Sequence, residues 1–119
     1  MTELGRVSIE AQDDVVVAHL AGELDLSNWE QVRATLEDAV TPDNGALVLE
    51  LGSTTYFDSA GVRLVFQLAE GLRNRRQGFA LVLGDNQIVQ RVAELTGICD
   101  HVACHPDVAA AVKAVGSDS

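Results

Sequence analysis

The chain has 119 residues, 47% of them hydrophobic, which suffices for one domain with a single buried core. Its formal charge is −10 and its pI is about 4.4. Phosphate backbones and anionic lipids repel so acidic a chain, so we expect no nucleic-acid binding. A basic protein surface is a better partner, although acidity alone also serves to keep a small protein soluble.

The N-terminus and the hydropathy predict a cytoplasmic protein. The first ten residues contain no apolar run of the secretory kind, and no apolar run approaches about 18 residues. We therefore expect neither a secretory signal nor a membrane span. The two cysteines, Cys99 and Cys104, are too few for a disulfide framework, which favours a reducing compartment. One domain is expected over 1–115, followed by a flexible tail over 116–119.

The first half of the chain predicts a hairpin, a helix and a buried strand. Residues 6–11 and 15–22 are rich in β-branched side chains and predict two paired strands. A helix is expected over 28–40, with Ser27 as its N-cap and apolar residues at helical spacing. The nearly continuous apolar run over 46–51 predicts a strand that is buried on both faces.

The second half predicts alternating helices and strands. Residues 52–57 are expected to form a link, followed by a helix over 59–75 that stops at Gly78. The later elements alternate in the same way: a strand over 79–83, a helix over 87–95 capped by Asn86 or Asp85, a short strand within 101–105 and a helix that starts at Asp107.

The expected order is therefore β-β-α-β-α-β-α-(β)-α. Strands that alternate with helices at this spacing predict right-handed crossovers and parallel pairing, while the opening hairpin makes the sheet mixed. We expect an α/β fold with a mixed, mostly parallel sheet of four to five strands and about four helices. Trp29 and Phe57 are expected in its core rather than as exposed anchors for a partner.

Asp58 and Ser59 stand where the predicted link enters the second helix. Sites in open sheets form at such places, and the first helical turn offers unpaired N–H groups and the positive end of the helix dipole. Gly61 would not obstruct close approach, and a phosphate on Ser59 would bring roughly −1.5 to −2 charges. Asp and Ser are also ordinary caps, worth ~1 kcal/mol, so a cap without further function is the alternative.

Three stretches of the chain resemble the STAS domain family in order and spacing. They are AGELDLSNWEQV, LVLELGSTTYFDSAGVRLV and VAELTGICDHV, and DSAG is the most specific element among them. The resemblance runs from about residue 7 to residue 112. More narrowly, the chain is similar to the stand-alone anti-sigma factor antagonists of bacteria, which implies a single STAS-like fold.

The resemblance implies regulation by partner switching. An unmodified antagonist binds an anti-sigma factor that is also a serine kinase, and so frees a sigma factor. The kinase then phosphorylates the antagonist, the complex dissociates, and a serine phosphatase restores the binding form. Carried onto this chain, Ser59 is the phosphoacceptor, with Asp25, Asp58 and Gly61 as its neighbours. We expect no enzyme activity, cofactor or metal, and a monomer or weak dimer.

The chain departs from the family pattern in the loop before Ser59. Glu50 stands where an aspartate is usual, and Ser53 and Thr54 stand where a glycine and an apolar residue are more common. These changes leave the shape of the loop open. Thr54 and Thr55 are alternative phosphoacceptors, which we place below Ser59.

Other functions stay open at this point. A STAS domain also serves as a regulatory subunit of another assembly, such as a lipid-transport ATPase, or as a small-molecule sensor, without phosphorylation. Cys99, His101, Cys104 and His105 are potential zinc ligands or a redox pair, although their spacing is compressed for a zinc finger. A hydrolase is disfavoured, because Ser59 has neither a GxSxG context nor a histidine nearby in the sequence.

Overall fold

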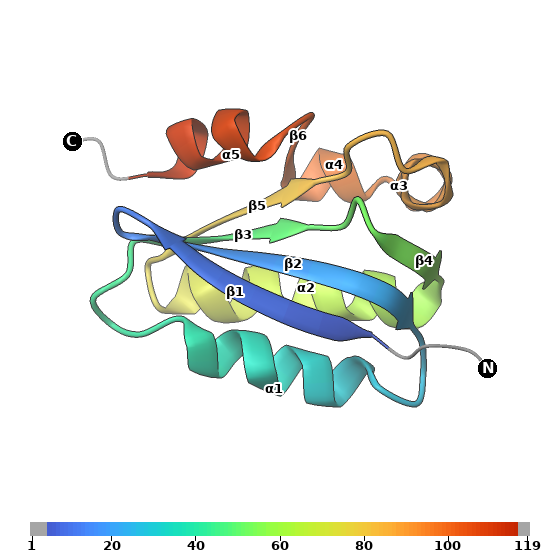
Figure 1. The fold of residues 1–119 in the computed structure, drawn as a ribbon, viewed down its shortest axis with the longest axis horizontal. Coiled ribbons are helices and arrows are strands. Elements are labelled where there is room, and N and C mark those ends of the chain that lie inside the picture. The colour runs from blue at the N-terminus through green and yellow to red at the C-terminus, as the bar shows by residue number, and fades with distance from the viewer. Residues whose placement is uncertain (1–4, 117–119) are drawn as a thin grey trace.

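One six-stranded sheet with helices on both faces organises the described residues, 5–116 of the computed structural model (Figure 1). Apart from Gly116, which follows the last helix, the predicted tail over 116–119 lies outside the described residues. In chain order the elements are β1 (Arg6–Gln12), β2 (Val15–Leu24), α1 (Trp29–Ala39), β3 (Ala46–Glu50), β4 (Thr54–Phe57), α2 (Ser59–Asn74), β5 (Gly78–Val82), α3 (Gln87–Thr96), α4 (Ile98–His101), β6 (Ala103–His105) and α5 (Val108–Val115).

The sheet is mixed and mostly parallel. β1 and β2 form the antiparallel hairpin, with Arg6 opposite Ala21 and Gln12 opposite Val15. The remaining pairs are parallel, in the order β1-β2-β3-β5-β6, and β4 pairs with β2 off this path. The α/β class and the mixed sheet are thus confirmed, with six strands and five helices in place of the four to five strands and about four helices expected.

β2 changes partner along its length, and this produces a strand that the sequence did not predict. Val15–His19 run beside β3, whereas Gly22, Glu23 and Leu24 run beside β4. The register shifts between Gly22 and Glu23, and Gly22 has a φ of 87°, a left-handed conformation that glycine adopts without strain. The predicted link over 52–57 therefore contains β4.

Two apolar layers hold the fold together. α1 and α2 cover one face of the sheet and α5 covers the other (Figure 1). Trp29 and Phe57 are both buried in the larger layer, as expected, and Glu50 ends β3. The side chains of the smaller layer include these: Val15, Val17, Val48, Val82 and Ala111.

Several predicted helix ends are confirmed. The Asn86 Oδ1 accepts hydrogen bonds from the backbone N–H groups of Ile88 and Val89, and so caps α3. The Asp107 carboxylate accepts from the Ala110 N–H at 2.8 Å and caps α5. Gly97, with a φ of 70°, ends α3 in the left-handed conformation that is common at helix C-termini.

Two predicted helix ends are wrong. α1 begins one residue later than expected, with Asn28 rather than Ser27 at the N-cap position, because the Ser27 side chain bonds to Asp25 instead. Gly78 does not stop α2, since it is the first residue of β5 and pairs with Ala46. The chain leaves α2 through Arg76, which has a φ of 60°.

The segment after α3 corrects the expectation for the cysteines. A one-turn helix, α4, precedes the short predicted strand, and it brings the Cα atoms of Cys99 and Cys104 to 5.6 Å, where a disulfide joins them. While this bond is in place the pair does not supply two zinc thiolates, and no group of three or more His, Cys, Asp or Glu side chains within residues 5–116 could hold a metal ion. No helix in this range is long and apolar enough to cross a bilayer.

Candidate functional site

Ser59 is exposed and is not the helix cap. It is the first residue of α2, while Asp58 occupies the N-cap and its Oδ1 accepts from the Ala60 N–H at 2.9 Å. Among the described residues, none forms a hydrogen bond with the Ser59 hydroxyl. The cap-only interpretation thus applies to Asp58, and the serine hydroxyl is left facing solvent at the positive end of the helix dipole.

The second oxygen of Asp58 binds Tyr56. The Tyr56 hydroxyl donates to the Asp58 Oδ2 at 2.9 Å. This hydrogen bond raises the pKa of Tyr56 above its ordinary value, and the negative charges of Asp58, Asp25 and Glu23 add to the increase. Both carboxylate oxygens of Asp58 are therefore occupied by neighbours other than Ser59.

Asp25 organises the loop between β2 and α1 in a different way. Its Oδ1 accepts from both the backbone N–H of Ser27 at 2.9 Å and the Ser27 hydroxyl at 2.6 Å. These hydrogen bonds, the side-chain bond first, lower the pKa of Asp25. Asn28 completes the loop, since its Oδ1 accepts from the Asp25 N–H and its Nδ2 donates to the Glu23 carbonyl at 2.8 Å.

The two aspartates share one open hollow of about 430 Å³ at the carboxyl ends of β2 and β4. The apolar residues that line this hollow are Leu26 and Tyr56, which are 80% and 45% exposed. Sequence reasoning missed both, because neither lies on a periodic apolar face that would have singled it out. Six side chains line the hollow: Glu23, Asp25, Leu26, Ser27, Tyr56 and Asp58.

Gly61 serves packing rather than surface access. It is the second residue after Ser59 and is buried in the first turn of α2. A methyl group on its Cα would lie 2.5 to 2.9 Å from three ring carbons of Phe57. Only glycine therefore lets α2 approach the end of β4 this closely.

The loop from Leu51 to Thr54 is held from the side of α3. The Asn86 Nδ2 donates to the carbonyl of Leu51 at 2.8 Å and to that of Thr54 at 2.7 Å. The same side chain caps α3 with its oxygen. One amide thus joins the start of α3 to the segment that leads into β4 and Ser59, which is a role beyond the predicted cap.

The threonines in this segment differ in accessibility. Thr54 is buried, with 2% of its surface exposed, and its hydroxyl donates to the Leu20 carbonyl at 2.9 Å. It is therefore unavailable to a kinase, which removes one of the two alternative phosphoacceptors. Thr55 is exposed in the middle of β4.

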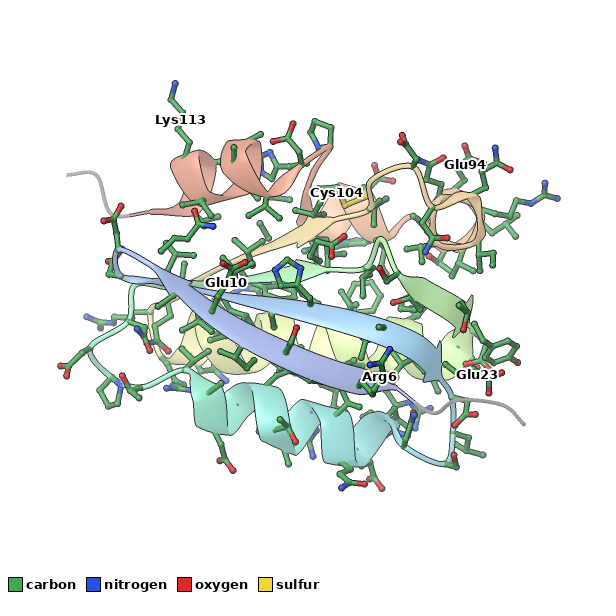
Figure 2. The ribbon with its side chains drawn as sticks, viewed as in Figure 1. Arg6, Glu10, Glu23, Glu94, Cys104 and Lys113 are labelled. Atoms are coloured by element: carbon green, nitrogen blue, oxygen red, sulfur yellow. A yellow bond between two sulfur atoms is a disulfide. The ribbon has the colours of Figure 1, made fainter. Side chains whose placement is uncertain are left out.

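Glu50, the unusual residue at the end of β3, fixes the same loop from the other side. Its Oε2 accepts from the Gly52 N–H at 2.6 Å, and its Oε1 faces the Nδ1 of His19 at 2.9 Å. The other ring nitrogen of His19 faces the Glu10 Oε2 at 2.7 Å. Glu10 lies on β1 (Figure 2). The hydrogen bonds to Glu10 and Glu50 outweigh partial burial and raise the pKa of His19.

Two arginines lie near the ring of the buried Trp29. The guanidinium groups of Arg33 and Arg63 each lie 5.8 Å from the ring centre of Trp29. Arg63 follows Ser59 by four residues, so its position is one helical turn along α2.

Comparison with known proteins shows the family. The family model of the STAS domain matches residues 6–111. The chain belongs to the STAS domain family. It is also 32% identical over 92 residues to BtrV of Bordetella bronchiseptica, which carries the name of an anti-sigma factor antagonist, and the match covers 77% of this chain and 78% of BtrV.

Solved structures share the fold of this STAS domain. An anti-sigma factor antagonist from Mycobacterium paratuberculosis is 23% identical, with a TM-score of 0.85 over 96% of both chains. The Bacillus cell fate determinant SpoIIAA in its phosphorylated form is 22% identical, with a TM-score of 0.67 over 92% of this chain and 99% of that one. At this level of identity the likeness establishes the architecture.

In this STAS domain the predicted site residues divide into two groups. Asp25 and Asp58 line one hollow, and Ser59 follows Asp58 directly, because the parallel strands β2 and β4 end side by side. Gly61 lies beneath them in the core and acts on the site only through the packing of α2.

Proposed function

We propose that this STAS domain is an anti-sigma factor antagonist that works by partner switching in the cytoplasm. Unphosphorylated, it binds an anti-sigma factor that is a serine kinase; phosphorylation of Ser59 releases that partner, and a serine phosphatase reverses the change. The observation that carries the proposal is the exposed Ser59 hydroxyl, which has no hydrogen-bond partner in the described chain. The name of BtrV and the phosphorylated SpoIIAA support it.

The switch is local and electrostatic. A phosphate on Ser59 adds roughly two negative charges at the first turn of α2, where the positive end of the helix dipole favours them without a change of fold. At a protein interface the same charges carry a large desolvation cost, and they lie near the carboxylates of Asp25 and Asp58. A 100-fold loss of affinity needs only about 2.8 kcal/mol.

The partner surface follows from the hollow beside Ser59. Three carboxylates, those of Glu23, Asp25 and Asp58, stand beside the exposed Leu26 and Tyr56. A partner that places a basic residue and an apolar side chain here complements both features, and the net charge of −10 steers it toward the chain. The domain contributes a binding surface and a phosphoacceptor, and the kinase contributes the catalytic groups.

The test uses candidate anti-sigma factor kinases from the same genome. We expect the unmodified domain to form a complex with one of them in ADP, and ATP to dissolve this complex. Ser59→Ala should form the same complex and keep it in ATP. A Ser59→Ala complex that dissociates on addition of ATP as fast as the native one would contradict the proposal. A domain that binds none of the kinases would point to a regulatory subunit of another assembly or to a small-molecule sensor.

A further inference from the structure

The disulfide between Cys99 and Cys104 ties two very short elements together. Cys99 is exposed in α4, and Cys104 is partly buried in β6, where it packs against the larger apolar layer (Figure 2). These are the only two cysteines of the chain, so no other thiol competes for either of them.

The elements that the bond joins have little local stability of their own. α4 has four residues, and β6 has three residues at the end of the strand order, paired with β5 alone within the described sheet. Apart from the disulfide, the buried side chains of Ile98 and Val102 and the Val102 N–H bond to the Ile98 carbonyl hold the turn. A terminal strand of this length is the part of a sheet that opens first.

The position of the bond favours reversible chemistry. Thiol–disulfide exchange needs a sulfur that an incoming thiolate can reach, and Cys99 provides one at the surface. In the cytoplasm, where the proposed function places this domain, disulfides are rare and those that form are usually transient or redox-sensing. We propose that Cys99 and Cys104 form a reversible redox site, and that reduction releases α4 and β6 from the edge of the sheet.

The exchange is a two-electron reaction with a cellular dithiol as the reductant. A thiolate of the dithiol attacks the Cys99 Sγ, the bond between the two cysteines breaks, and Cys104 leaves as a thiolate that takes a proton from water. The second thiol of the reductant then attacks the mixed disulfide. It releases Cys99 as a thiol and leaves the reductant oxidised to its own disulfide; the reverse sequence restores the bond.

Release of α4 would also break one contact with α2, the helix that starts at Ser59. The ring of His101, the last residue of α4, packs edge-on against Phe66 of α2, with 5.7 Å between ring centroids. The redox proposal itself does not depend on phosphorylation, and it is tested below without a kinase.

The first experiment measures the state of the two cysteines. The whole protein is equilibrated in glutathione buffers, from mostly oxidised to the reduced ratio of a bacterial cytoplasm, with a catalytic dithiol protein present. Free thiols are then alkylated and counted by mass spectrometry. We expect no alkylation in the oxidised buffer, two alkylated cysteines in most molecules in the reduced buffer, and recovery of the bond on return. A bond that persists in the reduced buffer is structural, and thiols that stay free in the oxidised buffer form no bond; either result overturns the proposal.

The second experiment measures what the bond holds in place. Amide hydrogen exchange is compared for the oxidised protein, the reduced protein and Cys99→Ser with Cys104→Ser, which keeps the size of both side chains. We expect exchange over 98–105 to be about tenfold faster in the reduced protein and in the double variant, with exchange in β2 and β3 unchanged. Equal exchange over 98–105 in all three would show that the bond does not hold this edge.

Discussion

The molecule contains two aspartate–serine pairs a short distance apart, and they differ in what the aspartate binds. Asp25 accepts both the N–H and the hydroxyl of Ser27, the latter at 2.6 Å. Asp58 instead accepts the Ala60 N–H with one oxygen and the Tyr56 hydroxyl with the other. One serine hydroxyl is therefore engaged, and the other, on Ser59, has no hydrogen-bond partner in the described part of the chain.

The difference teaches how a fold leaves one hydroxyl ready for reaction. Ser27 must give up a short hydrogen bond to a charged group before it can enter a kinase. Ser59 gives up no hydrogen bond to the described part of the chain. Its aspartate also caps α2 and so fixes the backbone that presents the hydroxyl. The two pairs thus assign structural and switching roles to the same residue types.

The largest expected effect is on affinity for the anti-sigma factor, and changes at Ser59 can separate the role of charge from that of side-chain shape. Phosphorylation should weaken binding of the anti-sigma factor about 100-fold, and Ser59→Asp, with one charge, about tenfold, because each decade corresponds to about 1.4 kcal/mol. Ser59→Asn is the matched control, since it has nearly the same shape and no charge, and it should bind within about threefold of the native domain. Isothermal titration measures all of them. Equal weakening by asparagine and aspartate would show that charge is not the switch.

The next effect tests the capping role of Asp58. Asp58→Ala removes the acceptor of the Ala60 N–H and should lower the free energy of unfolding by about 1 kcal/mol. Asp58→Asn retains an N-cap acceptor and should lower the free energy of unfolding by only roughly a few tenths of a kcal/mol. Urea denaturation of the two variants beside the native domain measures the difference. If Asp58→Ala unfolds at the native midpoint, then the start of α2 does not depend on this cap.

A smaller effect is available from Tyr56, the only tyrosine of the chain. Its pKa is raised by the hydrogen bond to Asp58 and by the nearby carboxylates, so the stability it contributes is present below the pKa of an unfolded tyrosine and is lost as the pH rises through the higher folded pKa. Asp58→Asn should move the pKa down toward about 10, and phosphorylation of Ser59 should move it further up. Ultraviolet titration of the tyrosinate absorbance measures both shifts; an unchanged pKa in Asp58→Asn would contradict the contact.

The smallest effect concerns the other pair. Ser27 lowers the pKa of Asp25, so the stability from this pair is present above the unfolded pKa of aspartate and is lost as the pH falls through the lower folded pKa. Ser27→Ala should therefore be less stable than the native domain near neutral pH and should match it more closely in acid. Thermal unfolding of both proteins across the acid range measures this. A difference that grows toward low pH would show that Asp25 gains nothing from Ser27.

Much of the fold follows from local sequence. The apolar strands over 46–50 and 79–82 are buried on both faces and read as strands, and capping residues such as Asn86 and Asp107 mark helix starts through their own side chains. The exposure of Ser59 also follows, because it stands where a link enters a helix at the carboxyl end of a strand.

What the sequence could not show depends on distant partners. In β4 only Thr54 and Phe57 are buried, so no apolar pattern marks it, and its pairing with β2 requires the bulge at Gly22. The Ser27 side chain could have served as an N-cap, but its hydroxyl instead donates to the Asp25 carboxylate. The disulfide needed the unpredicted turn of α4, and the hold of Asn86 on the loop joins residues 32 to 35 positions apart.

The most direct test maps the phosphate on the native domain and on two matched variants. The native domain, Ser27→Ala and Ser59→Ala are each incubated with the cognate anti-sigma factor kinase and ATP, and the modified peptides are sequenced by mass spectrometry. The account predicts one phosphate, on Ser59, in the native domain and in Ser27→Ala, and none in Ser59→Ala. Phosphate on Ser27 or Thr55 of the native domain, or unchanged incorporation in Ser59→Ala, would contradict it.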